Sequence, residues 1–282
     1  MPFSEDLIHA AQDLPTIVEQ EIKQLEDRLK VAKTLRKFTT ALALYVQSSK
    51  PLHILELQTK ESKLLQQIED FQPVVYADIQ QIFQAAEQEA KTLEPFSVKF
   101  PKLFSQACQE AGLTIDSDSR HPIYTFDNKF FEVKLNEAKK TVNISNYEAG
   151  RLDDVPADIA AAIETLQRER KRVFDKAEDS AAFLKLLRRE YLRIINAEHK
   201  KDGDSVPIRP IIHTLGNNKG IDHYRPDEFV VALSQLLKEG QTQIDSCQLD
   251  LQQTKDTKEG VLPITESSRG YVGFLLFRKI DV

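Results

Sequence analysis

The spacing of hydrophobic and polar positions predicts helices through the first third of the chain. In the segment 15–47, apolar residues recur at intervals of three and four, with Glu, Lys and Arg between them. The recurring positions are Val18, Ile22, Leu25, Leu29, Ala32 and Leu35. This spacing is typical of a coiled coil. We expect the helix to pack against a partner helix, because a long helix with a polar exterior is stabilised mainly by burying its apolar stripe. Periodic segments at 52–71 and 73–92 follow after short breaks, so we predict an antiparallel, coiled-coil-like helical module over residues 1–95.

The pattern changes between residues 122 and 145, where β-branched and aromatic residues cluster in short runs. Three runs, 122–126, 130–135 and 141–145, are separated by turn-like polar segments. Such runs predict a three-stranded antiparallel meander. A further apolar run at 271–277 predicts a C-terminal strand, which we expect to extend the same sheet.

A long amphipathic helix is predicted from residue 154 to residue 201. Its start is indicated by the segment Asp153-Asp154-Val155-Pro156, because proline and carboxylates are favoured in a first helical turn. The apolar stripe that follows consists of Ile159, Ile163, Leu166, Val173, Ala177, Leu184, Leu187, Tyr191 and Ile194. The same spacing fits two helices joined near Glu178-Asp179-Ser180. We expect this stripe to cover the meander, since three strands need a covering layer.

Weaker patterns complete the expected domain of residues 96–282. They predict a short helix at 102–111, an extended edge segment at 206–215, a helix from Pro226 to Gly240 and a weakly helical segment at 244–254. Together with the meander, these elements predict a mainly helical α+β fold.

Composition narrows the class of protein only slightly. The 282 residues are 41% hydrophobic and carry a net charge of −6, which argues against a surface that coats nucleic acid throughout. The two cysteines, Cys108 and Cys247, are far apart in sequence and are interpreted as idle thiols. No apolar run reaches the length of a transmembrane helix, and the N-terminus lacks a signal-peptide pattern, so we expect a cytoplasmic protein without membrane contact.

Basic residues lie between the apolar positions of segment 154–201. The arginines are Arg168, Arg170, Arg172, Arg188, Arg189 and Arg193. Several arginines on one helix face would suit the phosphates of DNA or RNA. The alternative that we favour is an internal or intersubunit charge match, for example one in which these side chains pair with carboxylates of the acidic N-terminal module.

Glu132-Val133-Lys134 is the sharpest candidate for catalysis. A Glu-x-Lys on a strand resembles the pair found in nucleases of the PD-(D/E)xK type, where carboxylates hold a divalent metal and lysine orients water. Asp116, Asp118 or Asp127 would then supply the upstream carboxylate. The same pattern is common on exposed strands, which is the interpretation that we favour. The sequence predicts no metal site and no cofactor.

The function that these patterns favour is a non-catalytic interaction or adaptor subunit. We expect Val18, Ile22, Leu25, Leu29 and Leu35 to bind a partner protein or a second copy of the chain. The setting would be a larger cytoplasmic, prokaryotic multi-protein assembly, including one that acts on nucleic acid or in defence. A nucleic-acid-binding module and a metal-dependent nuclease remain the alternatives.

Overall fold

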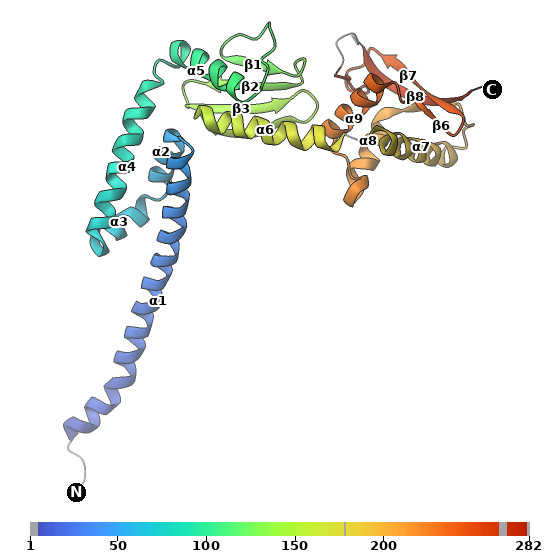
Figure 1. Ribbon diagram of the computed structural model, residues 1–282. Helices are drawn as coiled ribbons and strands as arrows, with labels where there is room; N and C mark the ends of the chain where they lie inside the picture. The colour runs from blue at the N-terminus through green and yellow to red at the C-terminus, as the bar shows by residue number, and fades with distance from the viewer. Residues whose placement is uncertain (1–4, 178, 265–269, 281–282) are drawn as a thin grey trace. The chain divides into compact units, whose positions relative to one another are not determined.

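The chain folds into two compact units, which are described separately. A computed structural model describes residues 5–177, 179–264 and 270–280 (Figure 1). The N-terminal unit comprises Met1–Glu94 and the C-terminal unit comprises Pro95–Val282. The predicted mainly helical α+β class is confirmed. Among the described residues, no helix has the length and apolar character needed to cross a lipid bilayer.

The N-terminal unit is built from four consecutive helices. They are α1 (Glu5–Gln47), α2 (Pro51–Lys60), α3 (Ser62–Phe71) and α4 (Pro73–Thr92). Proline occupies the first position of α2 and of α4, where its missing N–H removes no helical hydrogen bond. The core brings all four helices together, with Phe38 and Leu42 of α1 against buried residues of α2–α4. It includes the edge-on pair of Phe38 and Phe83, with ring centroids 6.5 Å apart.

Helix α1 is much longer than the bundle that covers it. Its first core contacts are made by the partly buried Val31 and Leu35, whereas each residue from 11 to 30 is exposed. At 1.5 Å per residue, this exposed part is about 30 Å long. Figure 1 shows it extending away from α3 and α4.

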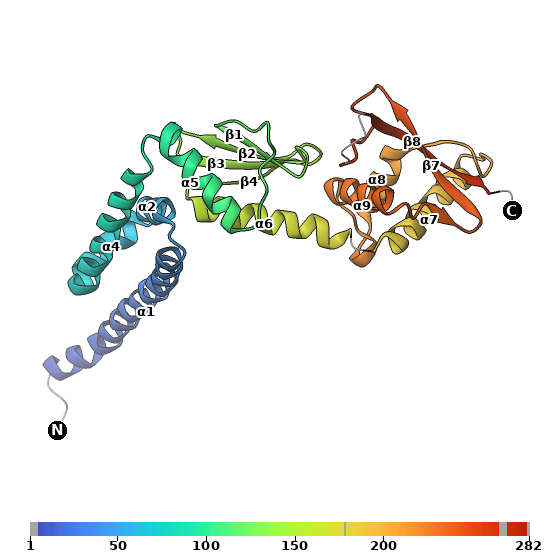
Figure 2. The same ribbon diagram turned by 45° about the horizontal axis from the view of Figure 1, so that its top comes forward.

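The C-terminal unit begins with α5 (Phe96–Glu110) and a four-stranded antiparallel sheet. The strands are β1 (Ile123–Phe126), β2 (Phe131–Asn136), β3 (Thr141–Asn146) and β4 (Gly150–Pro156), in the order β1-β2-β3-β4. Alternate residues bury one face of the sheet, as Tyr124, Val133 and Ile144 do in adjacent strands. Helices α5 and α6 (Ile159–Lys176) lie beside this sheet (Figure 2).

The second half of the same unit combines helices with another antiparallel sheet. Its helices are α7 (Ser180–Ala197), α8 (Ile208–Asn217), the 3₁₀ turn η1 (Gly220–Asp222) and α9 (Pro226–Glu239). Its strands are β5 (Val206–Pro207), β6 (Gln243–Ile244), β7 (Cys247–Thr254) and β8 (Tyr271–Lys279), in the order β5-β8-β7-β6. Helix α9 contacts both α6 and α7, so it connects the two halves.

The single helix predicted over 154–201 is wrong. Residues 150–156 form β4, a fourth strand after the predicted meander, and Asp154 pairs with Asn143 of β3. Charged side chains are common on such edge strands, where they discourage pairing with other chains. The helical part divides into α6 and α7, which fits the alternative of two helices. Asp179 caps the start of α7 by accepting a hydrogen bond from the Ala182 N–H at 2.8 Å. Residue 178, between the two helices, lies outside the described part of the chain.

Three weaker predictions in the C-terminal unit are also wrong. Strand β8 pairs with β5 and β7 and does not extend the meander. The weakly helical segment 244–254 is mostly β7, whose buried Cys247 and Leu249 alternate with polar residues in a two-residue period. The segment 206–215 is mostly α8. Pro210 does not prevent this helix, because it lies in the first turn, where proline is tolerated.

Two isoleucines test the contrast between covered and uncovered helix surface. We expect Ile68→Ala to lower the free energy of unfolding of the N-terminal unit by about 2–5 kcal/mol, since Ile68 is 1% exposed. Ile22→Ala should change it by less than about 0.5 kcal/mol, since Ile22 is 50% exposed. Urea unfolding of the full chain at low protein concentration measures both. Equal losses for the two variants would show that α1 is covered along its whole length.

Candidate protein-binding face of the N-terminal helix

Large apolar side chains line the exposed part of α1. We call those on one side of the helix the α1 stripe: Leu14, Val18, Ile22, Leu25 and Leu29. Each of them is between 50% and 60% exposed. The stripe includes four of the five residues predicted as a partner interface. The fifth, Leu35, is partly buried against the core of its own unit and lies on another side of the helix.

The stripe and the core-facing residues of α1 occupy different sides of the helix. At 3.6 residues per turn, Val18, Ile22, Leu25 and Leu29 fall within an arc of about 60°. The residues that face the bundle core are Val31, Leu35, Phe38 and Leu42. Their mean direction is about 140° from that of the stripe, by the same geometry. The stripe is therefore a separate apolar surface that helices α2–α4 do not cover.

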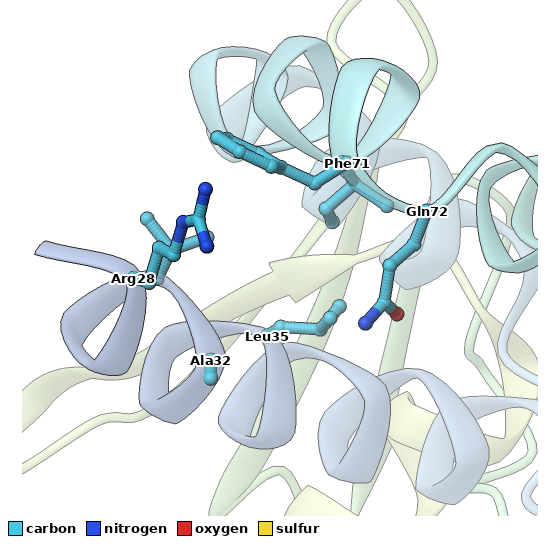
Figure 3. Close-up of a pocket in the computed structure, with 7 residues that line it drawn as sticks. Arg28, Ala32, Leu35, Phe71 and Gln72 are labelled. Carbon is cyan, nitrogen blue, oxygen red and sulfur yellow. The ribbon is translucent and has the colours of Figure 1, made fainter. Parts of the chain in front are cut away.

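A mainly apolar cavity lies near the C-terminal end of the stripe. Its volume is about 380 Å³. It is lined by Arg28, Val31, Ala32, Leu35, Ile68, Phe71 and Gln72. Figure 3 shows Arg28 and Leu35 of α1 facing Phe71 and Gln72, which come from the end of α3 and the residue after it. Phe71 is 60% exposed, so this cavity adds a large aromatic surface beside the α1 stripe.

Charge changes sign along the exposed part of α1. Residues 13–27 contain one lysine, Lys23, and five carboxylates: Asp13, Glu19, Glu21, Glu26 and Asp27. Residues 28–37 contain no carboxylate and five cations: Arg28, Lys30, Lys33, Arg36 and Lys37. The stripe is thus flanked by negative charge over most of its length and by positive charge at its C-terminal end.

The six arginines predicted as a basic face have partners inside the C-terminal unit. The contacts are Arg168 with Asp153, Arg170 with Asp127, Arg172 with Asp227, Arg188 with Asp202, Arg189 with Asp222, and Arg193 with Glu190 and Thr214. Three are bidentate: Arg170 donates to Asp127 at 2.6 and 2.8 Å, Arg188 to Asp202 at 2.7 and 2.6 Å, and Arg172 to Asp227 at 3.4 and 2.5 Å. These contacts are internal charge matches, but the carboxylates belong to the arginines' own unit and not to the N-terminal module that we expected.

The most buried of these pairs joins α6, α9 and the first sheet. Asp227 is fully buried; it accepts hydrogen bonds from Arg172 and, at 3.0 Å, from the Asn146 amide. Arg172 also donates to Glu228 at 2.8 Å. Burial alone would raise the pKa of Asp227, but the hydrogen bond and charge of Arg172 outweigh burial and lower that pKa. Arg172 therefore holds the two halves of the unit together.

Glu132 and Lys134 lie on the less buried face of β2, opposite Ser145 and Asn143 of β3. The carboxylates proposed to join them have other roles. Asp116 accepts backbone N–H groups of the turn residues Asn128 and Lys129, at 3.2 and 2.7 Å. Asp118 pairs with Lys129, and Asp127 with Arg170. In the described part of the chain, no three His, Cys, Asp or Glu side chains are placed to hold a metal ion.

Both cysteines are buried in the C-terminal unit. Burial raises the pKa of the Cys108 thiol to about 12, so this thiol stays protonated at neutral pH. Cys247 lies in β7, with its Sγ 3.8 Å from Nη2 of Arg188. Both thiols are thus shielded from solvent, and their idleness stays a prediction.

Sequence reasoning missed the cavity residues that come from the end of α3. Ile68, Phe71 and Gln72 meet α1 only through the packing of the bundle, which a helical period does not describe. The one available signal was Phe71 itself, an aromatic residue just before the break at Pro73. A search of protein-family models, of curated proteins and of solved structures found no match to this chain.

The buried Arg172–Asp227 pair predicts a pH-dependent stability. We expect Asp227→Asn to lower the free energy of unfolding by about 3 kcal/mol at neutral pH, because it removes one partner of a buried ion pair. The Asp227 carboxylate stabilises the fold at pH values above 3.8, its ordinary pKa. This contribution is lost as the pH falls through the lower pKa of the folded state. The difference between wild type and variant should therefore shrink in acid.

The matched control is Asp250→Asn, which breaks the exposed ion pair of Asp250 with Arg278. It should change the free energy of unfolding by less than about 1 kcal/mol. Urea unfolding at several pH values measures both variants. A difference for Asp227→Asn that stays constant down to acid pH would contradict the lowered pKa of Asp227.

Proposed function

We propose that this protein is a non-catalytic interaction subunit that binds a partner protein through the α1 stripe. The observation that carries the proposal is the exposure of five large apolar side chains on one side of a helix that its own unit leaves uncovered. Contiguous exposed apolar patches of this kind mark interaction surfaces in proteins. The setting we propose is a larger cytoplasmic multi-protein assembly.

The physical argument rests on what stabilises a long helix. Most helices in proteins are stabilised by packing an amphipathic face, and an uncovered helix gains little from propensity alone. Residues 11–30 of α1 have no such packing within their unit. A partner that covers the α1 stripe would provide it, and the anchored half of α1 holds the stripe ready for binding.

The C-terminal unit supports the non-catalytic interpretation through its contacts. The arginines of α6 and α7 are neutralised by carboxylates of the same unit, and Arg188 is itself buried. The carboxylates Asp116 and Asp127 hold a turn and an arginine. These contacts favour a structural role for the charged groups, so neither the nucleic-acid alternative nor the nuclease alternative is proposed for this unit.

The proposal predicts that two glutamates in the stripe abolish partner binding while the fold survives. The variant is Ile22→Glu with Leu25→Glu in the full chain. Both residues are exposed, so far-UV circular dichroism and the melting temperature should stay close to wild type. Proteins that co-purify with the tagged full chain, after cross-linking in the cells that produce it naturally, should fall to background level.

A matched control adds the same two charges to another side of the same helix. The control is Gln20→Glu with Gln24→Glu; both glutamines are exposed and point about 140° away from the stripe, on average, at 100° per residue. This control should retain the partners that wild type retains. Equal recovery of the same partners with the stripe variant and with wild type would refute the proposed function.

A further inference from the structure

We propose that the protein bound by the α1 stripe is a second copy of this chain, whose α1 helix runs antiparallel to the first. This inference rests on the proposed function and names its partner. Three features of the helix carry it: the order of charges along α1, the free surface beside the stripe, and the position of the cavity at Phe71.

The charges beside the stripe are arranged for an antiparallel pairing. On one flank Glu19 and Glu26 are followed by Lys33, and on the other Glu21 is followed by Arg28. At 100° per residue, all five lie within about 100° of the stripe's centre line. Both flanks therefore change from negative to positive in the same direction along the helix.

Only one orientation of two identical helices brings these opposite charges together. In a parallel pair, each acidic segment lies beside the acidic segment of the other copy, and each basic segment beside the basic one. In an antiparallel pair centred near residues 24–25, residues 12–21 of each copy lie beside the basic segment 28–37 of the other, and residues 22–27 lie beside their own counterparts. The helix dipoles also oppose each other in this orientation. Electrostatics therefore favour the antiparallel pair and disfavour the parallel one.

The surface needed for this pairing is open on α1. An antiparallel crossing centred near residues 24–25 places Leu14 of one copy at the level of Leu35 of the other. On the stripe side of the helix, Ala32, Lys33 and Arg36 are exposed at that level. Helices α2–α4 pack about 140° away and leave this path free.

Two hollows lie where the start of the second copy's stripe would arrive. One is the apolar cavity of about 380 Å³ that Phe71 and Ala32 line. The other, of about 550 Å³, is lined by the cations Lys33, Arg36 and Lys37 together with Thr40, Ala41 and the exposed Leu44. At 100° per residue, the apolar hollow and the cationic hollow lie on opposite flanks of the path that the second copy would follow, so the N-terminal part of its stripe would pass between them.

Charge-exchange variants of the full chain test the inference. The first changes Glu19, Glu21 and Glu26 to Lys, the second changes Arg28, Lys33 and Arg36 to Glu, and the third combines all six changes. We expect the wild type to form a reversible dimer in sedimentation equilibrium. Either triple variant should weaken dimerisation at least about tenfold, because like charges then meet. The variant with all six changes should recover a dimer affinity within about threefold of wild type, because the opposite charges meet again.

Circular dichroism of each variant controls for folding, and the Ile22→Glu, Leu25→Glu variant should be monomeric. Two results would overturn the antiparallel arrangement: triple variants that dimerise as well as wild type, or a variant with all six changes that stays as weak as the triple ones. A wild type that remains monomeric at rising concentration would overturn self-association. So would a monomer that binds a fluorescent DNA duplex through the basic segment 28–37, since that segment would then have another ligand.

The proposed function can fail or survive independently. A monomeric wild type that retains another protein, lost in the stripe variant and kept in the Gln20→Glu, Gln24→Glu control, would overturn self-association and leave the interaction function intact. A monomeric wild type whose partners are recovered equally with the stripe variant would overturn both proposals.

Discussion

The mismatch in length between α1 and the bundle that covers it is the constraint on which this interpretation depends. The bundle core begins at Val31 and Leu35 on α1, and the preceding twenty residues are exposed. Starting a helix is unfavourable, but extending one that is already formed is not. The packed half of α1 therefore serves as a nucleus for the exposed half, and the stripe can be presented in helical form before any partner binds.

The C-terminal unit is organised by a different interaction, the pairing of arginines with carboxylates across its elements. Arg172 of α6 reaches Asp227 of α9, which also accepts a hydrogen bond from Asn146 at the end of β3. Arg209 of α8 similarly reaches Glu148, in the turn between β3 and β4. A buried charge that loses its partner is costly, so such pairs fix which surfaces meet. The basic residues that looked like a binding face in the sequence are in this way part of the unit's internal structure.

An element was predictable from sequence where its hydrophobic period and the residues at its two ends indicate the same type of structure. Helix α4 and the strands at 131–136 and 141–146 lie within one or two residues of their predicted positions. Prediction failed where a local signature competed with pairing: Asp153-Asp154-Val155-Pro156 resembles a helix start, yet it forms the edge strand β4 because β3 offers it a hydrogen-bonding partner. The partners of the arginines were also unpredictable, since Arg172 and Asp227 are far apart in sequence and meet only in the folded unit.

The same limit explains why the sequence did not separate the two apolar surfaces of α1. Val18–Leu29 and Val31–Leu42 both show intervals of three and four, so they look like one continuous seam that includes Leu35. Between Leu29 and Val31 the pattern changes phase, which rotates the second set by about 140° around the helix. One helix thus presents two stripes, and the bundle takes only the second. A phase change of this kind gives a long amphipathic helix two separate apolar surfaces, and here the helix's own unit covers one of them.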